Sequence, residues 1–214
     1  MKQMGGDTVQ ANGTMGQREP VKDMARILGR WVDGMAARVF AQSTVDELAE
    51  YSGVPVVNAL SDLYHPCQAL ADAMTIEERF GSCEGLRVAY VGDGNNVAHS
   101  LMITAARLGA QVVVGAPKGY EPNPMVTEQA RRGGVVEIVN DPREAVAGAD
   151  AAVIVTEWPE FHAVLDDEVR AAMANPLIVD GRNLLDPTEA VAAGFAYVPI
   201  GRGERVPDGE PTGA

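Results

Sequence analysis

The chain has 214 residues, of which 46% are hydrophobic and 22% charged, and this composition is typical of a folded globular protein. Its net charge of -13 opposes binding to nucleic acid or to an anionic membrane surface, and aromatic residues, at 5%, are too sparse for base-stacking platforms. No apolar run reaches membrane-spanning length and the start has no signal-peptide core, so we expect a cytoplasmic protein without nucleic-acid or membrane partners.

Amphipathic helices and short apolar strands are predicted in the first part of the chain. Residues 1–19 show no sustained period. Pro20 starts a run whose apolar positions follow helical spacing, and Thr44 with Glu47 has the spacing of a capping box at the start of a second helix. These patterns predict helices over 20–34, 44–53 and 69–80, and strands over 36–40 and 54–59.

Apolar strands alternate with amphipathic helices from residue 86 onward, which predicts a parallel sheet covered on both faces. The predicted strands are 87–91, 111–116, 135–139, 151–156, 177–179 and 196–200, and the predicted helices are 97–108, 124–132, 142–147, 166–174 and 187–193. The predicted fold class is therefore α/β, with two Rossmann-like parallel-sheet units, of which the first is incomplete and the second doubly wound. We expect domains over 1–82 and 83–202 and a disordered tail over 203–214.

The two cysteines, Cys67 and Cys83, lie on either side of a predicted helix. A helix of that length separates its ends too far for a disulfide, so we expect free thiols in a reducing compartment. Cys67 is expected to be a small buried thiol and not a nucleophile.

A short loop between the strand 54–59 and the next helix holds His65 and Gln68, with Pro66 where the first helical turn tolerates proline. A strand end that presents an imidazole and a carboxamide at a helix start suits a small polar or anionic group. The alternative is that His65 only caps or packs at this junction.

Residues 92–96 read Gly-Asp-Gly-Asn-Asn between a predicted strand and a helix, as in a dinucleotide-binding loop. The third glycine position is Val97, and the next strand ends without an acid for a ribose hydroxyl, so we expect no nicotinamide cofactor. The asparagines can instead cap the helix. His99 and His162 lack the paired spacing of metal ligands; we expect them in packing or surface positions, and no metal.

Residues 63–72 read Leu-Tyr-His-Pro-Cys-Gln-Ala-Leu-Ala-Asp, which resembles the His-Pro-x-Gln-x-Leu-Ala-Asp signature of ornithine carbamoyltransferases. Segments 19–28, 54–58 and 91–97 resemble the same family in order and spacing, so the resemblance covers about residues 13–150. It implies transfer of a carbamoyl group from carbamoyl phosphate to ornithine, which gives citrulline and phosphate. It also implies a homo-oligomer, which in this family is a trimer.

The resemblance assigns roles to four side chains. Arg38 would reach the carbamoyl and phosphate oxygens, His65 the carbamoyl oxygen and Gln68 the carbamoyl nitrogen, while Asn96 would bind the amino acid. Attack on the carbamoyl carbon pushes charge onto its oxygen, so fixed donors from Arg38 and His65 would stabilise the transition state, and Gln68 would orient the carbamoyl amide. This chemistry needs no metal, cofactor or covalent nucleophile. Without the resemblance, the alternative is that Arg38 is an ordinary solvated arginine at the end of a strand.

The chain departs from this family at both ends. The family's Ser-x-Arg-Thr-Arg motif is absent before residue 20 and its ornithine motifs are absent after residue 150, which predicts low turnover. Residues 149–202 are instead similar to the UDP-binding C-terminal domain of UDP-glucose 6-dehydrogenases. In that resemblance Arg182, which follows Asp-Gly after a buried strand, would contact a UDP-sugar; otherwise it is an ordinary strand-end charge.

Three functions follow from these patterns. The leading prediction is an ornithine carbamoyltransferase-like enzyme whose second sheet is a hybrid of two families joined near residue 150. The first alternative is a UDP-sugar-binding module related to UDP-glucose 6-dehydrogenase. The second is a non-catalytic fusion fragment.

Overall fold

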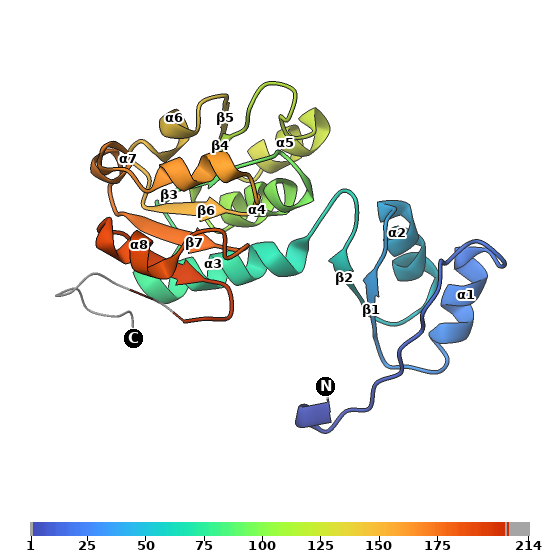
Figure 1. The fold of residues 1–214 in the computed structure, drawn as a ribbon. Coiled ribbons are helices and arrows are strands. Elements are labelled where there is room, and N and C mark those ends of the chain that lie inside the picture. Colours follow the sequence, from blue (N-terminus) through green and yellow to red (C-terminus); the bar gives the residue numbers. More distant parts are fainter. Residues whose placement is uncertain (1, 204, 206–214) are drawn as a thin grey trace.

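The computed structural model describes residues 2–203 and residue 205. Two parallel sheets lie in separate α/β units, and the long helix α3 follows the last strand of the first unit and lies along the second (Figure 1). The strands are β1 (Met35–Arg38), β2 (Val56–Leu60), β3 (Arg87–Val91), β4 (Gln111–Gly115), β5 (Val136–Val139), β6 (Ala151–Ile154), β7 (Leu177–Asp180) and β8 (Ala196–Pro199). The α-helices are α1 (Val21–Leu28), α2 (Gln42–Tyr51), α3 (Pro66–Phe80), α4 (Asn96–Arg107), α5 (Pro124–Arg131), α6 (Pro142–Val146), α7 (Asp167–Ala172) and α8 (Pro187–Ala192). Two short 3-10 helices, η1 (Lys2–Met4) and η2 (Pro159–Val164), were not expected.

In the first unit, β1 and β2 pair in parallel, with Met35 opposite Val56 and Arg38 opposite Leu60. Helix α1 ends at Leu28, six residues before the predicted end at 34. The next residue, Gly29, lies so close to α2 that a Cβ there would sit 1.9 Å from the Ser52 carbonyl oxygen. The tight contact between the two helix ends, and not the apolar pattern, therefore sets where α1 stops.

Helix α2 begins at Gln42, so the predicted capping box of Thr44 and Glu47 is wrong. The N-cap position is Ala41, whose side chain offers no acceptor. The Asp62 carboxylate accepts from the Gln42 backbone N–H at 2.9 Å instead. Because Asp62 lies in the loop after β2, this cap also fastens α2 to the segment that leads to His65.

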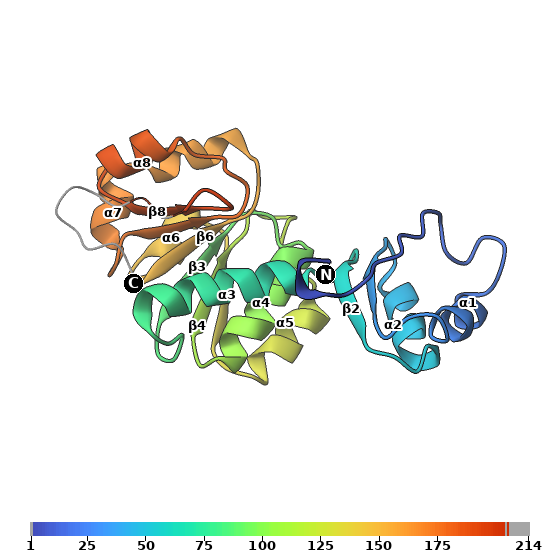
Figure 2. The ribbon, with the colours of Figure 1, turned by 90° about the horizontal axis from the view of Figure 1, so that it is seen from below.

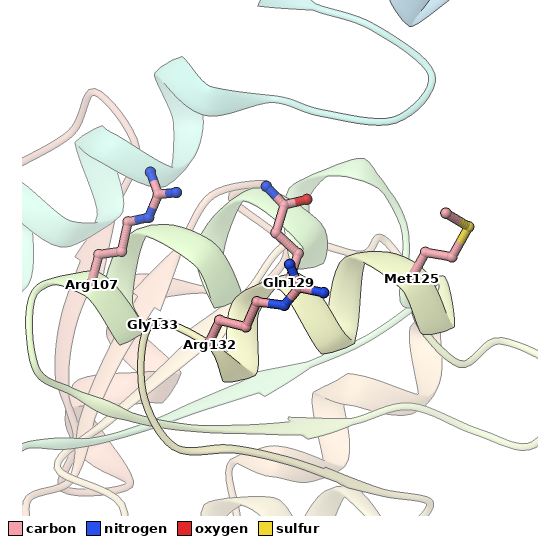
Figure 3. Close-up of a pocket in the computed structure, with 5 residues that line it drawn as sticks. All are labelled: Arg107, Met125, Gln129, Arg132 and Gly133. Atoms are coloured by element: carbon pink, nitrogen blue, oxygen red, sulfur yellow. The ribbon is translucent and has the colours of Figure 1, made fainter.

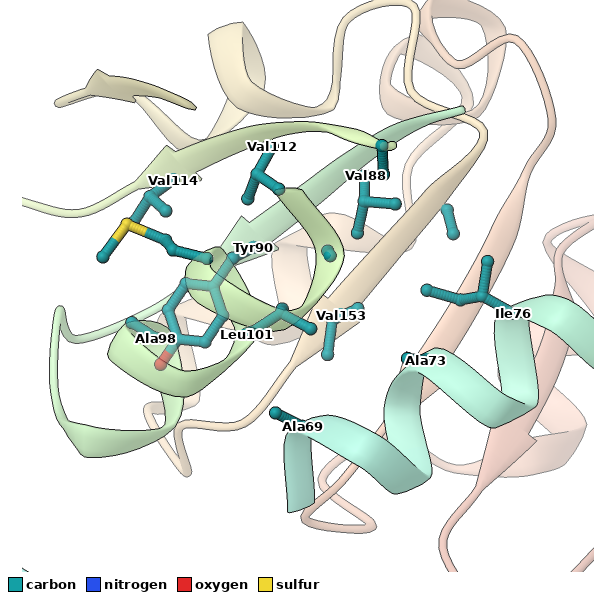
Figure 4. Close-up of a cluster of buried hydrophobic side chains, with 14 of the residues drawn as sticks. Ala69, Ala73, Ile76, Val88, Tyr90, Ala98, Leu101, Val112, Val114 and Val153 are labelled. Carbon is teal, nitrogen blue, oxygen red and sulfur yellow. The ribbon is translucent and has the colours of Figure 1, made fainter. Parts of the chain in front are cut away.

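The second unit is a six-stranded parallel sheet in the order β5-β4-β3-β6-β7-β8. Helices α3, α4 and α5 cover one face and α6, α7 and α8 the other (Figure 2). Alternate residues of each strand enter opposite cores: Val88 and Tyr90 of β3 pack under α3 and α4, as Figure 4 shows, and Ala89 and Val91 pack on the other side. The α/β class with two parallel-sheet units is thus confirmed.

This strand order has a functional consequence. The chain moves outward from β3 through β4 to β5, then returns to add β6, β7 and β8 on the other side of β3. The strand order therefore reverses between β3 and β6, and the carboxyl ends of the strands at such a switch point are where doubly wound sheets bind ligands. Residues 92–96 form the loop after β3 at this position.

Both cysteines are free thiols, as expected, but only Cys83 is buried. The expectation that Cys67 is buried is wrong. Helix α3 turns Ala69, Ala73 and Ile76 toward the second sheet, whereas Cys67 projects from its first turn, with its Sγ 3.5 Å from the Asn58 carbonyl oxygen.

The proposed domain boundaries stay a prediction, and most of the tail expected over 203–214 lies outside the described residues. Within the part of the chain that the structure describes, no helix is both long and apolar enough to cross a bilayer.

Candidate active site

The loop after β3 is held tightly at the carboxyl ends of the strands. The Thr156 hydroxyl, just after β6, accepts from the Asp93 backbone N–H at 3.1 Å, and the Tyr90 hydroxyl donates to the Asp93 carbonyl at 2.7 Å. Gly92 has φ 151°, and a Cβ there would lie 2.2 Å from the Thr156 hydroxyl oxygen. Only glycine allows this approach, so the loop after β3 is held tightly against the end of β6.

The two asparagines at the start of α4 have different partners. The Asn95 side chain accepts from the Val97 backbone N–H at 2.9 Å and caps the helix. The Asn96 amide donates to the Ser61 carbonyl at 2.6 Å. Asn95 thus has the capping role, and Asn96 links α4 to the segment between β2 and α3.

The same face of α4 fastens this segment at two further points. The Ser100 hydroxyl accepts from the His65 backbone N–H at 2.8 Å. The His99 ring bonds the Leu63 carbonyl through Nδ1 and the Asn123 backbone N–H through Nε2, both at 2.9 Å. Since Nε2 accepts, the proton lies on Nδ1 and the ring is neutral. His99 is 5% exposed, which confirms it as a packing residue, and His162 lies on the surface.

The stability conferred by His99 is expected to fall in acid. Burial lowers the pKa of His99 below its ordinary value, although the Leu63 carbonyl and Asp93 oppose the shift. The unfolded chain then takes up this proton at a higher pH than the folded chain. The contribution is complete above about pH 6.5 and is lost as the pH falls toward the folded pKa, by at most about 1.4 kcal/mol per pH unit.

The measurement is urea unfolding of the wild type and His99→Gln at about pH 5.5, 7 and 8. Gln keeps a donor and an acceptor but does not titrate, so the difference between the two proteins isolates His99 from the other ionisable groups. That difference should shrink in acid. A difference that is the same at all three pH values would contradict the expectation.

His65 occupies the N-cap position of α3, yet its side chain makes no capping hydrogen bond. Its Nδ1 is buried without a hydrogen-bond partner among the described residues. Burial, and then the positive charges of Arg38 and Arg182, lower the pKa of His65. The imidazole is therefore neutral at physiological pH, and two guanidinium groups from different sheets lie close enough to act on it.

Gln68 lies one turn further along α3 and bonds a buried acid. Its Nε2 donates to Asp72 Oδ1 at 2.8 Å. Asp72 is 2% exposed, its Oδ2 has no partner among the described residues, and burial raises its pKa to about 6. Opposite lies Gly181, where a Cβ would be 3.4 Å from Gln68 Nε2. Gln68 and the end of β7 therefore lie against each other.

A cavity of about 190 Å³ lies beside this pair, between α3 and the ends of β7 and β8. Its lining residues are Gln68, Ala71, Asp72, Thr75, Val179, Asp180, Gly181, Val198, Pro199, Ile200, Gly201 and Gly203.

Arg182 is anchored at the end of β7. Its Nε donates to the Val155 carbonyl at 3.0 Å, and its Nη1 lies 3.6 Å from the Glu157 carboxylate. Asp180 is completely buried and accepts from the Arg182 and Leu185 backbone N–H groups at 2.9 and 3.0 Å. These bonds fix the loop that follows Gly181, so Arg182 is not a freely solvated charge.

Arg38 comes from the carboxyl end of β1 and is exposed, with no acidic partner among the described residues. Its charge acts on the His65 ring. The structure thus places Gln68, one turn after His65, against the Gly181 that precedes Arg182, and connects Asn96 to the segment before His65 through Ser61. Arg38 lies at the end of β1, from where its charge acts on His65.

A larger hollow of about 510 Å³ lies on the outer surface of α4 and α5, away from these residues (Figure 3). It is lined by Arg107, Met125, Gln129, Arg132 and Gly133. One lining residue, Gln129, accepts at 3.3 Å from the hydroxyl of Tyr64, which precedes His65. The described residues contain no group of three or more His, Cys, Asp or Glu placed to hold a metal ion.

Sequence reasoning did not single out Asp72, Tyr90 or Thr156. Asp72 is the last residue of the signature, four residues after Gln68 on a predicted helix. Helical side chains at this spacing meet, so the sequence could have indicated the bond between Gln68 and Asp72. The contacts of Tyr90 and Thr156 depend on the pairing of strands far apart in the sequence, so no local pattern indicates them.

Two family models match nearly the whole chain. The first is described as the carbamoyl-P binding domain of aspartate/ornithine carbamoyltransferase and matches residues 1–78. The second is the Asp/Orn binding domain of the same family and matches residues 84–203. The chain belongs to the aspartate/ornithine carbamoyltransferase family.

Similar carbamoyltransferases confirm the first resemblance. An ornithine carbamoyltransferase from Gloeobacter violaceus is 42% identical over 97% of this chain and 68% of its own length. One from Thermococcus kodakarensis is 46% identical over 89% of this chain and 61% of its own. The solved ornithine carbamoyltransferase from Pyrococcus furiosus has a TM-score of 0.69 at 40% identity, covering 78% of this chain and 60% of that one. The chain thus spans roughly two thirds of the length of these carbamoyltransferases.

The second resemblance is not supported. The Asp/Orn binding domain of the carbamoyltransferase family extends over residues 84–203 and so across the predicted junction near 150. The Gloeobacter violaceus relative likewise covers 97% of the chain. The comparisons thus give no support to a hybrid sheet, to a chimera or to a UDP-sugar role of Arg182. They also give no support to the expected low turnover.

Proposed function

We propose that this carbamoyltransferase-family chain transfers a carbamoyl group from carbamoyl phosphate to ornithine and yields citrulline and phosphate. The observation that carries the proposal is the placement of His65 and Gln68 at the start of α3, with Gly181, which precedes the anchored Arg182, against Gln68. The positive charge of the exposed Arg38 also acts on His65. The similarity to ornithine carbamoyltransferases supports the choice of ornithine.

The reaction needs donors at the carbamoyl oxygen. The neutral δ-amino group attacks the carbamoyl carbon, a C–N bond forms, and negative charge moves onto the carbamoyl oxygen. The C=O bond then re-forms as the C–O bond to phosphate breaks, and the leaving phosphate takes up the proton that the amine loses. Arg38 and His65 would donate to that oxygen, and such fixed donors act most strongly where charge develops. A neutral His65 keeps one N–H to donate and does not repel the two guanidinium groups.

Phosphate needs positive charge. The charges of Arg38 and Arg182 both act on His65, and the 15-residue helix α3 directs the positive end of its dipole toward its N-cap, His65. We assign both arginines to the phosphate end of the substrate. This assignment accounts for anion binding in a chain whose net charge is -13.

The remaining roles concern orientation. Gln68 would accept from the carbamoyl nitrogen, and Asn96 would contact the amino acid, since it lies at the start of α4, directly after the switch-point strand β3. A homo-oligomer, a trimer by family resemblance, is part of the proposal and can be measured by light scattering.

The test is a colorimetric citrulline assay on the purified full chain, with carbamoyl phosphate and ornithine omitted in turn. Citrulline should form only when both are present, and calorimetry should show carbamoyl phosphate binding before ornithine is added. Arg30→Met, which removes an exposed arginine of the first unit, is the matched control for loss of one positive charge. Absence of both citrulline and carbamoyl phosphate binding would refute the proposal.

A further inference from the structure

We propose that Asp72 is a positioning residue for carbamoyl transfer, because its buried carboxylate fixes the Gln68 carboxamide with the amide oxygen directed at the substrate. The inference rests on the proposed function and extends it to a residue that does not itself touch the carbamoyl group.

The hydrogen bond decides which way the amide points. An ionised carboxylate has no proton to donate, so the atom bonded to Asp72 Oδ1 at 2.8 Å must be the Gln68 nitrogen. The Gln68 oxygen then lies on the other side of the amide, where it can accept from the carbamoyl N–H groups. If the Gln68 amide were reversed, its NH₂ group would face the NH₂ group of the substrate's carbamoyl moiety, and neither could accept a hydrogen bond.

Gln68 needs such an anchor. A glutamine side chain has three rotatable bonds, and Gly181 opposite it has no side chain to hold it in place. Asp72 lies four residues on, on the same face of α3, which is the spacing at which helical side chains meet. The acid and the amide thus form a pair on one rigid element.

The carboxylate is poorly suited to a purely structural role. Asp72 is 2% exposed, its Oδ2 has no partner among the described residues, and it lines a cavity together with a second buried acid, Asp180. Burying a charge with so few partners costs stability, and burial raises the pKa of Asp72 to about 6. An apolar residue would stabilise the fold better, but it could not orient Gln68.

The experiment compares Asp72→Leu with Asp72→Asn in citrulline formation and in thermal melting. Leu removes the acceptor and the charge; we expect kcat/KM for carbamoyl phosphate to fall about 10- to 100-fold while Tm rises. Asn keeps an acceptor oxygen, and we expect it to restore kcat/KM to within about threefold of the wild type. Thr75→Val, which changes a lining residue of the same cavity without a bond to Gln68, should leave both readouts unchanged.

A double-mutant comparison tests whether Asp72 acts through Gln68. In a Gln68→Met background there is no amide to orient, so adding Asp72→Leu should lower kcat/KM no further. An equal further loss in that background, or Asp72→Asn as inactive as Asp72→Leu, would overturn the inference. So would an Asp72→Leu enzyme with the wild-type rate. A wild-type chain that forms no citrulline would instead refute the proposed function, and this role with it.

Discussion

His65→Leu is expected to lower kcat/KM for citrulline formation by about 100- to 1,000-fold, the usual cost of losing one oxyanion donor. The side chain has a single task in the structure, since its Nδ1 has no partner among the described residues and the Ser100 contact uses only the His65 backbone. The substitution should therefore remove the donor and leave the N-terminus of α3 in place. Initial rates at varied carbamoyl phosphate concentrations measure the loss.

Two further variants make this result specific. His65→Gln returns an N–H donor without a titrating ring and should recover part of the rate. His162→Leu removes an exposed histidine in η2 and should have no effect. If His65→Leu keeps more than about a tenth of the wild-type kcat/KM, His65 is not an oxyanion donor.

Asp180→Ala is expected to destabilise the chain by about 3–5 kcal/mol, the range found when one partner of a buried charged network is removed. Asp180 is fully buried, and Oδ2 accepts from the Tyr197 hydroxyl at 2.7 Å and from the Leu185 backbone N–H at 3.0 Å. Alanine leaves these donors and the Arg182 N–H without their partner. Urea unfolding at neutral pH gives the free-energy difference.

Asp186→Ala is the matched control. Asp186 is an exposed acid in the same region that caps α8 by accepting from the Thr188 and Glu189 backbone N–H groups. Its loss should lower stability far less than that of Asp180. If the two variants lose the same free energy of unfolding, the buried Asp180 network stabilises the chain no more than an exposed helix cap does.

The second sheet was predictable in nearly all its parts. Strand β3 has the predicted bounds 87–91, and the other strands differ from their predictions by at most two residues at either end, because a buried parallel strand is an uninterrupted apolar run. The first unit was less predictable. The start of α2 depends on Asp62 and the end of α1 on Ser52, and neither partner lies near enough in the sequence for a local pattern to indicate it.

The candidate site, too, was predictable only in part. Arg38, His65, Gln68 and Asn96 were proposed from family resemblance, and their roles remain predictions. The UDP-sugar role of Arg182 found no support, because a charge after a buried strand does not by itself identify its ligand. What the sequence could not indicate is that the end of β7 at Gly181, just before Arg182, lies against Gln68, since β7 and α3 meet only in the folded chain.

Helix α3 starts at the predicted substrate and runs back for 15 residues along the second sheet, where Ala69, Ala73 and Ile76 anchor it (Figure 4). At about 1.5 Å per residue it is a rod of roughly 22 Å, so a tilt of about 3° about its far end carries Gln68 through about 1 Å. His65 and Gln68 would then move together, because both lie at the N-terminal end of the helix. A substitution at the far end, at the left-handed C-cap Gly81, is therefore expected to change the rate of the proposed reaction without altering any group that meets the substrate.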